Sequence, residues 1–140
     1  MPTLEKPRAF SFPSFQDYFE KCKSFIATVQ DELAISIAHD PVASDQQART
    51  IESYRVGMRE ILAFADSYLD LAEAEALKKL PPRSKELTDL DRETRVAAAV
   101  STERRFRDVV KGICESIDTR VSYVQTRLRV FSAAEGQKFT

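Results

Sequence analysis

The fold of this chain is decided by residues 106–131, which read FRDVVKGICESIDTRVSYVQTRLRVF. Apolar residues recur along this stretch at every third or fourth position: Phe106, Val110, Ile113, Ile117, Val121, Val124, Leu128 and Phe131. Such spacing is typical of a helix with one continuous apolar seam. The helical pattern continues on both sides of the stretch, so the sequence predicts one uninterrupted helix from Thr88 to Ala134.

A helix of this length is too long for a compact domain formed by 140 residues. At about 1.5 Å per residue, roughly 45 residues span about 65 Å. A compact domain of this size has a radius of gyration of only about 14 Å. Either an extended hairpin within the chain or further copies in an assembly must therefore cover the seam. We expect self-association through the seam residues Val110, Ile113, Ile117, Val121, Val124, Leu128 and Phe131.

The composition favours long helices and excludes the common nucleotide-binding loops. Apolar residues make up 43% of the chain, and glycine occurs only at Gly57, Gly112 and Gly136. This scarcity of glycine argues against β-hairpins and tight turns. Glycine-rich phosphate loops need several closely spaced glycines, and the sequence contains no such cluster.

Capping signals and prolines predict two helices before the long one. The first, over about 15–39, begins at Ser14, with Asp17 as an approximate capping box. It ends before the Asp40-Pro41 step, because proline disfavours a helical conformation in the residue before it.

The second helix is predicted over about 45–80, starting near Ser44 with Gln47 at the capping-box position. The pair Pro81-Pro82 stops it and reverses the chain. The apolar stripe in its C-terminal half is rich in alanine, which lets a partner helix approach closely. That feature suits an antiparallel helical hairpin with the third helix.

The third helix is predicted over about 89–134, with Thr88 and Asp91 as its capping box and Gly136 just beyond its end. Together these signals predict an all-α fold of three long helices. We expect an antiparallel helical hairpin with a long, coiled-coil-like C-terminal helix, in an oligomeric protein.

Residues 1–13 contain three prolines, which forbid a stable helix there. Two interpretations stay open for this segment. It is either a disordered N-terminus or an extended arm whose Phe10 and Phe12 dock on a neighbouring helix or subunit. Residues 14–140 are expected to form a single helical domain.

The residues that enzymes use are scarce, so we expect no enzyme and neither a cofactor nor a metal site. His39 is the one histidine, and beside Asp40 near a helix end it favours a dipole interaction rather than catalysis. Cys22 and Cys114 have no metal or redox spacing and are expected to be buried free thiols. No signal peptide or membrane span is apparent, so we expect a cytoplasmic protein, in the host cytoplasm if phage-encoded.

Charge is divided unevenly along the chain. Residues 1–80 carry 9 Lys/Arg against 13 Asp/Glu, a net of −4, and residues 81–140 carry 12 against 9, a net of +3. Six basic residues would cluster at the tip of the predicted hairpin and form a candidate DNA surface: Lys78, Lys79, Arg83, Lys85, Arg92 and Arg95.

Two other features limit that interpretation of the basic residues. Four acidic residues lie in the same stretch and could neutralise it, and an ordinary solvated helix surface would also carry such charges. No aromatic residue occurs between Lys78 and Arg105. The tip is therefore expected to contact phosphates and not to stack on bases.

The segment Cys114-Glu-Ser-Ile117-Asp-Thr-Arg120, followed by Val124, resembles the C-terminal helix of the UvsY-type recombination mediator proteins of T-even-like phages. The resemblance implies a small non-enzymatic protein that assembles into a ring-like oligomer through its C-terminal helices. It also implies binding of single-stranded DNA and help to a recombinase in displacing single-strand-binding protein. The nearest counterpart of the family's basic segment is Lys78-Lys79 with Arg83 and Lys85, although a proline pair replaces the family's glycine-containing connector.

These observations lead to two functional hypotheses. The first is a non-enzymatic, single-stranded-DNA-binding accessory protein that assists recombinase loading in phage-type recombination and repair. A recombinase or a single-strand-binding protein would then be its protein partner. The second is a helical, oligomeric protein-interaction or structural assembly module that binds no nucleic acid.

Overall fold

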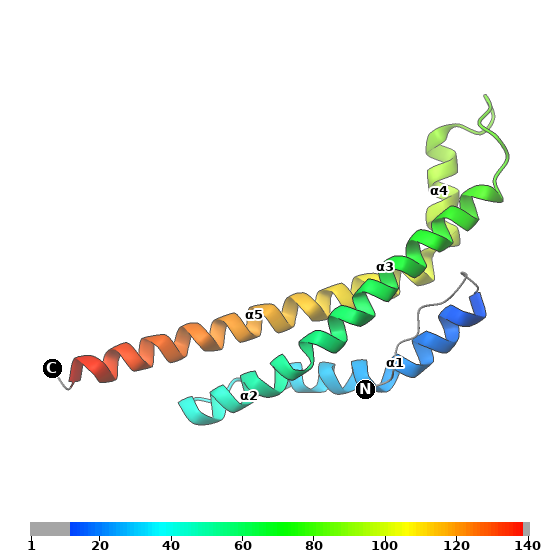
Figure 1. The fold of residues 1–140 in the computed structure, drawn as a ribbon. Helices are drawn as coiled ribbons and strands as arrows, with labels where there is room; N and C mark the ends of the chain where they lie inside the picture. The colour runs from blue at the N-terminus through cyan, green and yellow to red at the C-terminus, as the bar shows by residue number, and fades with distance from the viewer. Residues whose placement is uncertain (1–11, 139–140) are drawn as a thin grey trace.

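The computed structural model describes residues 12–138, and this part of the chain is helical with no strand. The expectation of an all-α fold is therefore confirmed. Figure 1 shows the helices, which the structure bounds as α1 (Phe12–Ala34), α2 (Pro41–Ser53), α3 (Arg55–Lys78), α4 (Asp89–Ala99) and α5 (Ser101–Lys138). Residues 1–11 of the predicted arm lie outside the described residues. Phe12 and Pro13 belong to α1, so the predicted start of the first helix at Ser14 is wrong.

The prediction of three uninterrupted helices is wrong, because two of them are divided. The predicted helix over 45–80 consists of α2 and α3, which meet at Tyr54. The predicted helix over 89–134 consists of α4 and α5, which meet at Val100. The remaining helix, α1, ends at Ala34, well before the predicted residue 39.

The division at Tyr54 is a tightened turn. The backbone N–H of Tyr54 donates to the carbonyl of Ile51 at 3.1 Å, a bond to the third residue back instead of the fourth. The Tyr54 ring packs edge-on against Phe25 of α1, with centroids 5.8 Å apart. The local helical pattern of the sequence does not predict a contact between residues this far apart in the chain.

The division at Val100 bends the chain away from the axis of α5. Val100 leaves the helical region, with φ −106° and ψ 18°. Its side chain is only 1% exposed and packs in a small apolar cluster with Leu69 and Ala72 of α3. Figure 1 shows α4 turned away from α5 and lying along the end of α3. Burial of Val100 against α3 therefore decides where the long helix bends.

Helices α1, α2 and α3 pack against α5, and α3 runs antiparallel to it. The direction follows from three ion pairs, in which rising numbers in α3 meet falling numbers in α5. They are Arg59 with Asp118 at 3.4 Å, Asp66 with Arg107 at 3.7 Å, and Glu73 with Arg104 at 3.3 Å. Helix α2 continues along α5 where α3 begins.

The core lies where α1, α3 and α5 meet. The Phe15 ring of α1 packs edge-on against Tyr68 of α3 at 5.3 Å and against Phe106 of α5 at 5.7 Å. The thiols of Cys22 and Cys114 are free and buried in this core, as predicted. Loss of hydration on burial raises the pKa of both thiols.

The segment between α1 and α2 is held by side chains from distant positions. Arg120 of α5 donates to the carbonyl oxygen of Leu33 at 3.0 Å and also to that of Ile35. Gln47 of α2 accepts from the N–H of Ala38 at 2.9 Å and donates to the carbonyl of Ser36 at 3.1 Å. The bond to Leu33 satisfies a carbonyl group that the end of α1 leaves unpaired, and the others hold the segment that follows Ala34.

The starts of the later helices test the predicted caps. Helix α2 begins with Pro41 after the N-cap Asp40, whose carboxylate accepts from the N–H of Ala43 at 3.0 Å, so the predicted cap at Ser44 is wrong. Proline suits this first helical position because its missing N–H would be unpaired anyway. At α4 the predicted capping box of Thr88 and Asp91 is confirmed.

The far end of α5 extends beyond the other helices (Figure 1). The helix continues to Lys138, so the predicted stop at Gly136 is wrong. No helix in the described part of the chain is long and apolar enough to span a membrane.

Candidate nucleic-acid and assembly surfaces

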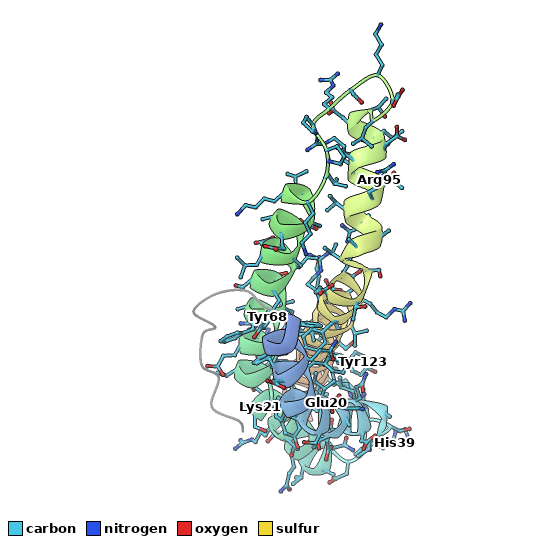
Figure 2. All side chains as sticks on the ribbon, turned by 90° about the vertical axis from the view of Figure 1, so that its right-hand side faces the viewer. Glu20, Lys21, His39, Tyr68, Arg95 and Tyr123 are labelled. Atoms are coloured by element: carbon cyan, nitrogen blue, oxygen red, sulfur yellow. The ribbon has the colours of Figure 1, made fainter. Side chains whose placement is uncertain are left out.

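The six candidate DNA-binding residues lie together at one end of the molecule. Lys78 ends α3, the loop 79–88 carries Lys79, Arg83 and Lys85, and α4 carries Arg92 and Arg95. Figure 2 shows α3 and α4 rising side by side to this loop, with Arg95 on α4. We call residues 78–95 the tip.

The loop of the tip is an ordered turn. Its one buried side chain is Leu87, whose N–H donates to the Ser84 hydroxyl at 3.1 Å and whose carbonyl accepts from the Ser84 N–H at 3.1 Å. Arg92 of α4 donates to the carbonyl of Pro81 at 2.5 Å. Arg92 therefore ties the loop to α4, and this bond competes with any contact it could make to a phosphate.

Two further basic residues of the tip form ion pairs with acidic side chains. Arg83 lies 3.3 Å from Asp89, and Lys79 lies 3.8 Å from Glu75. Exposed pairs of this kind contribute only about 0–1 kcal/mol and are readily exchanged. Three exposed cations have no ion pair within the described residues: Lys78, Lys85 and Arg95.

The charges around the tip are nearly balanced. Between residues 75 and 95 the chain has six basic and five acidic residues. Hydrogen bonds from the Thr88 hydroxyl and N–H hold the pKa of the Asp91 carboxyl below its usual value, so this acid stays ionised. The tip therefore presents individual positive side chains separated by acidic ones, and not a continuous positive surface.

An acidic groove beside the tip restricts where an anion can lie. Between α3 and α4 a groove of about 940 Å³ is lined by four carboxylates and two guanidinium groups: Asp70, Glu73, Asp89, Glu93, Arg92 and Arg104. The carboxylates of the groove repel phosphates, which carry the same sign of charge. A nucleic acid would therefore approach the tip from the side of the unpaired cations and not along this groove.

The candidate assembly seam is mostly covered within a single chain. Five of its seven residues are buried in the structure: Val110, Ile113, Ile117, Val121 and Val124. Leu128 is half-buried, and the Phe131 side chain lies outside the described part of the structure. Packing against α2 and α3 covers the seam as far as Val124, so burial of these five residues needs no second copy.

Sequence reasoning missed an apolar groove between α1 and α5. Its walls include Phe19 of α1 and Val109 of α5, and its rim carries Lys23 and Arg105. The available signal was weak: Val109 lies on α5 next to the seam position Val110, and only the placement of α1 makes the two helices into a groove.

Four of the residues that carry the resemblance to mediator proteins have structural roles in this chain. Cys114, Ile117 and Val124 are buried, and Arg120 binds the carbonyl groups at the end of α1. Among the described residues, no cluster of His, Cys, Asp and Glu side chains could hold a metal ion. Comparison with family models, curated proteins and solved structures finds no match.

Proposed function

We propose that this protein is a non-enzymatic accessory protein that binds single-stranded DNA through the tip. The observation that supports this proposal is the set of exposed cations without ion pairs on one end of the molecule, Lys78, Lys85 and Arg95. The tip has no aromatic side chain for stacking. Binding would therefore be electrostatic, sequence-independent and sensitive to salt.

The resemblance around Cys114 and Arg120 supports the same class of protein, a mediator that assists a recombinase. Self-association belongs to this proposal as well. The end of α5 beyond Val124, where Val130 is 64% exposed, would be the surface for it. A recombinase or a single-strand-binding protein would be the partner of the assembled protein.

Fluorescence anisotropy with a labelled oligo-dT strand tests the DNA proposal. Each phosphate contact contributes about −0.7 to the slope of log affinity against log salt for single strands, so three contacts give about −2. Affinity should therefore fall by more than tenfold, roughly 16-fold, between about 50 mM and 200 mM salt. The triple variant Lys78→Glu, Lys85→Glu, Arg95→Glu should lose at least tenfold in affinity at the lower salt concentration.

The matched control reverses three exposed cations outside the tip: Lys21→Glu, Lys111→Glu and Arg129→Glu. It changes the net charge of the chain by the same amount. This control should alter affinity by less than about threefold, because general attraction between protein and DNA is screened over about 14 Å at this ionic strength. Absence of binding at the lower salt concentration, or an equal loss in the control, would refute the DNA proposal.

The rival function is a protein-interaction module that does not bind DNA. The near balance of charge at the tip and the bond of Arg92 to Pro81 favour this alternative. Light scattering separates the two when it is measured beside the anisotropy. An oligomer without DNA affinity supports the rival, and a DNA-binding oligomer supports the mediator.

A further inference from the structure

The groove between α1 and α5 extends along four turns of α1. Its α1 wall extends from Gln16 to Gln30, and its α5 wall from Thr102 to Val109. At about 1.5 Å per residue, the α1 wall is about 21 Å long. The space measures about 430 Å³.

The floor of the groove is apolar. Three aromatic rings and two aliphatic side chains make most of it: Phe15, Phe19, Phe106, Ile26 and Val109. Phe19 and Phe106 pack edge-on at 5.1 Å and are fixed by the core behind them. Val109 remains 45% exposed although it lies next to this apolar surface. An apolar floor of this rigidity is a preformed site that a second apolar surface can cover.

The charged groups on the groove have one sign. Lys23 on α1 and Arg105 on α5 line opposite walls, and both side chains are exposed. Neither forms an ion pair within the described residues. None of the described residues that line the groove is acidic, and Asp108, three residues along α5 from Arg105, is paired with Arg107 at 2.8 Å.

From this arrangement we infer that the α1–α5 groove is a docking site for an amphipathic helix of a partner protein that carries acidic residues on both flanks. An apolar stripe with a spacing of three and four residues would lie on Phe19, Ile26 and Val109. Acidic side chains on its two flanks would face Lys23 and Arg105. A four-turn helix, about 14 residues, matches the length of the groove. The site does not overlap the tip, so it goes beyond the proposed DNA binding.

A displayed library of amphipathic helices tests this inference on the full chain. The apolar stripe of the library is fixed, and each flank position varies among Glu, Gln and Lys. Selection should enrich Glu on both flanks. The double reversal Lys23→Glu, Arg105→Glu should weaken the selected peptide by at least tenfold and should strengthen its Lys-flanked counterpart. The double reversal Lys21→Glu, Lys111→Glu is the control with equal charge change and should weaken the selected peptide less than threefold.

The variant Ala27→Trp tests the place of binding without removing a core side chain. Ala27 is exposed on α1 and lines the groove, so a large ring there should fill it and abolish peptide binding while the melting temperature is retained. No enrichment, enrichment of Lys or Gln flanks, or full binding to Ala27→Trp would refute the inference. Because the tip is not involved, the anisotropy of oligo-dT binding should be unchanged in Ala27→Trp, which keeps this test separate from the DNA proposal.

The same measurements would detect two other occupants of the α1–α5 groove, a second copy of the chain or its own N-terminal residues. If Ala27→Trp lowers the mass measured by light scattering, a second copy of the chain occupies the groove and the assignment to a partner is wrong. If Phe10→Ala strengthens the selected peptide by tenfold or more, residues 1–11 of the chain itself occupy it, and the assignment is again wrong.

Discussion

The guanidinium of Arg120 in α5 donates a 3.0 Å hydrogen bond to the carbonyl oxygen of Leu33 at the end of α1. The two residues are 87 positions apart in the sequence. A positive side chain at a helix C-terminus also interacts favourably with the negative end of the helix dipole. Arg120 therefore fixes the place where α1 ends and where the segment 35–40 leaves it.

Replacement of Arg120 by alanine should destabilise the fold. A hydrogen bond to a charged group contributes about 1.5–3 kcal/mol, and part of this is recovered by water because the side chain is only half-buried. We expect the free energy of unfolding in urea to fall by about 2 kcal/mol. Arg129→Ala, which removes an exposed arginine of the same helix, should change it by less than about 0.5 kcal/mol. Equal effects of the two variants would show that the bond to Leu33 is not important.

Ile117→Asp separates burial within the chain from burial between chains. Ile117 is fully buried in the single chain, and an unpaired charge in such a place is strongly destabilising. We expect the variant to lose its helical circular dichroism and its cooperative melting transition. A variant that keeps the wild-type helical signal and only dissociates in light scattering would contradict this expectation.

The control for this experiment lies further along the same helix. Val130→Asp places the same charge on the exposed end of α5 and should keep the melting temperature of the wild type within about 2 °C. If α5 ends assemble, the control should lower the mass measured by light scattering while Ile117→Asp unfolds the chain.

The buried thiols and a buried phenol should make the fold less stable at high pH. Loss of hydration raises the pKa of Cys22 and Cys114, and burial also raises that of Tyr18 above its ordinary value. The folded state therefore holds these protons more tightly than the unfolded chain does. The contribution of the two thiols to stability is fully present below the unfolded thiol pKa of about 8.5 and is lost as pH rises through the higher folded pKa.

Urea unfolding at pH 7 and pH 9.5 measures this effect. The free energy of unfolding should be lower at pH 9.5, and a chain with Cys22→Ala and Cys114→Ala should show a smaller decrease. Both thiols should react slowly with a disulfide reagent at pH 8 in buffer and at once in denaturant, because little thiolate exists in the fold. Rapid reaction of either thiol in the folded protein would contradict the burial of that side chain.

Glu103 is a buried carboxylate with an incomplete set of hydrogen bonds. The residue is 3% exposed, and its Oε2 has no hydrogen-bond partner in the described part of the chain. Removal of a buried charge without a good partner is often stabilising. We expect Glu103→Leu to raise the free energy of unfolding by about 1 kcal/mol. Glu115→Leu, on the exposed face of the same helix, should change it by less than about 0.5 kcal/mol. A loss of stability in Glu103→Leu would show that this carboxylate holds a favourable contact.

Some features of the candidate sites could be predicted from the sequence, and others depend on the tertiary structure. The sequence placed six basic residues near the proline loop, and the structure brings them to one end of the molecule. It could not show that Arg92 binds the Pro81 carbonyl or that Arg83 pairs with Asp89, because such bonds depend on how the loop turns back on α4. The α1–α5 groove was out of reach because it exists only between two helices that are distant in sequence.

By itself the sequence determined the helical class, the apolar seam of α5 as far as Val124, the capping box of Thr88 and Asp91, and the burial of the two thiols. These features depend on residues within one or two turns of each other, where periodicity and capping act. Only the tertiary structure decided the bend at Val100, the tightened turn at Tyr54 and the bond from Arg120 to Leu33. Each of these arises from contact between helices that lie far apart in the chain, and the free energy of that packing overrides a local preference for continued helix.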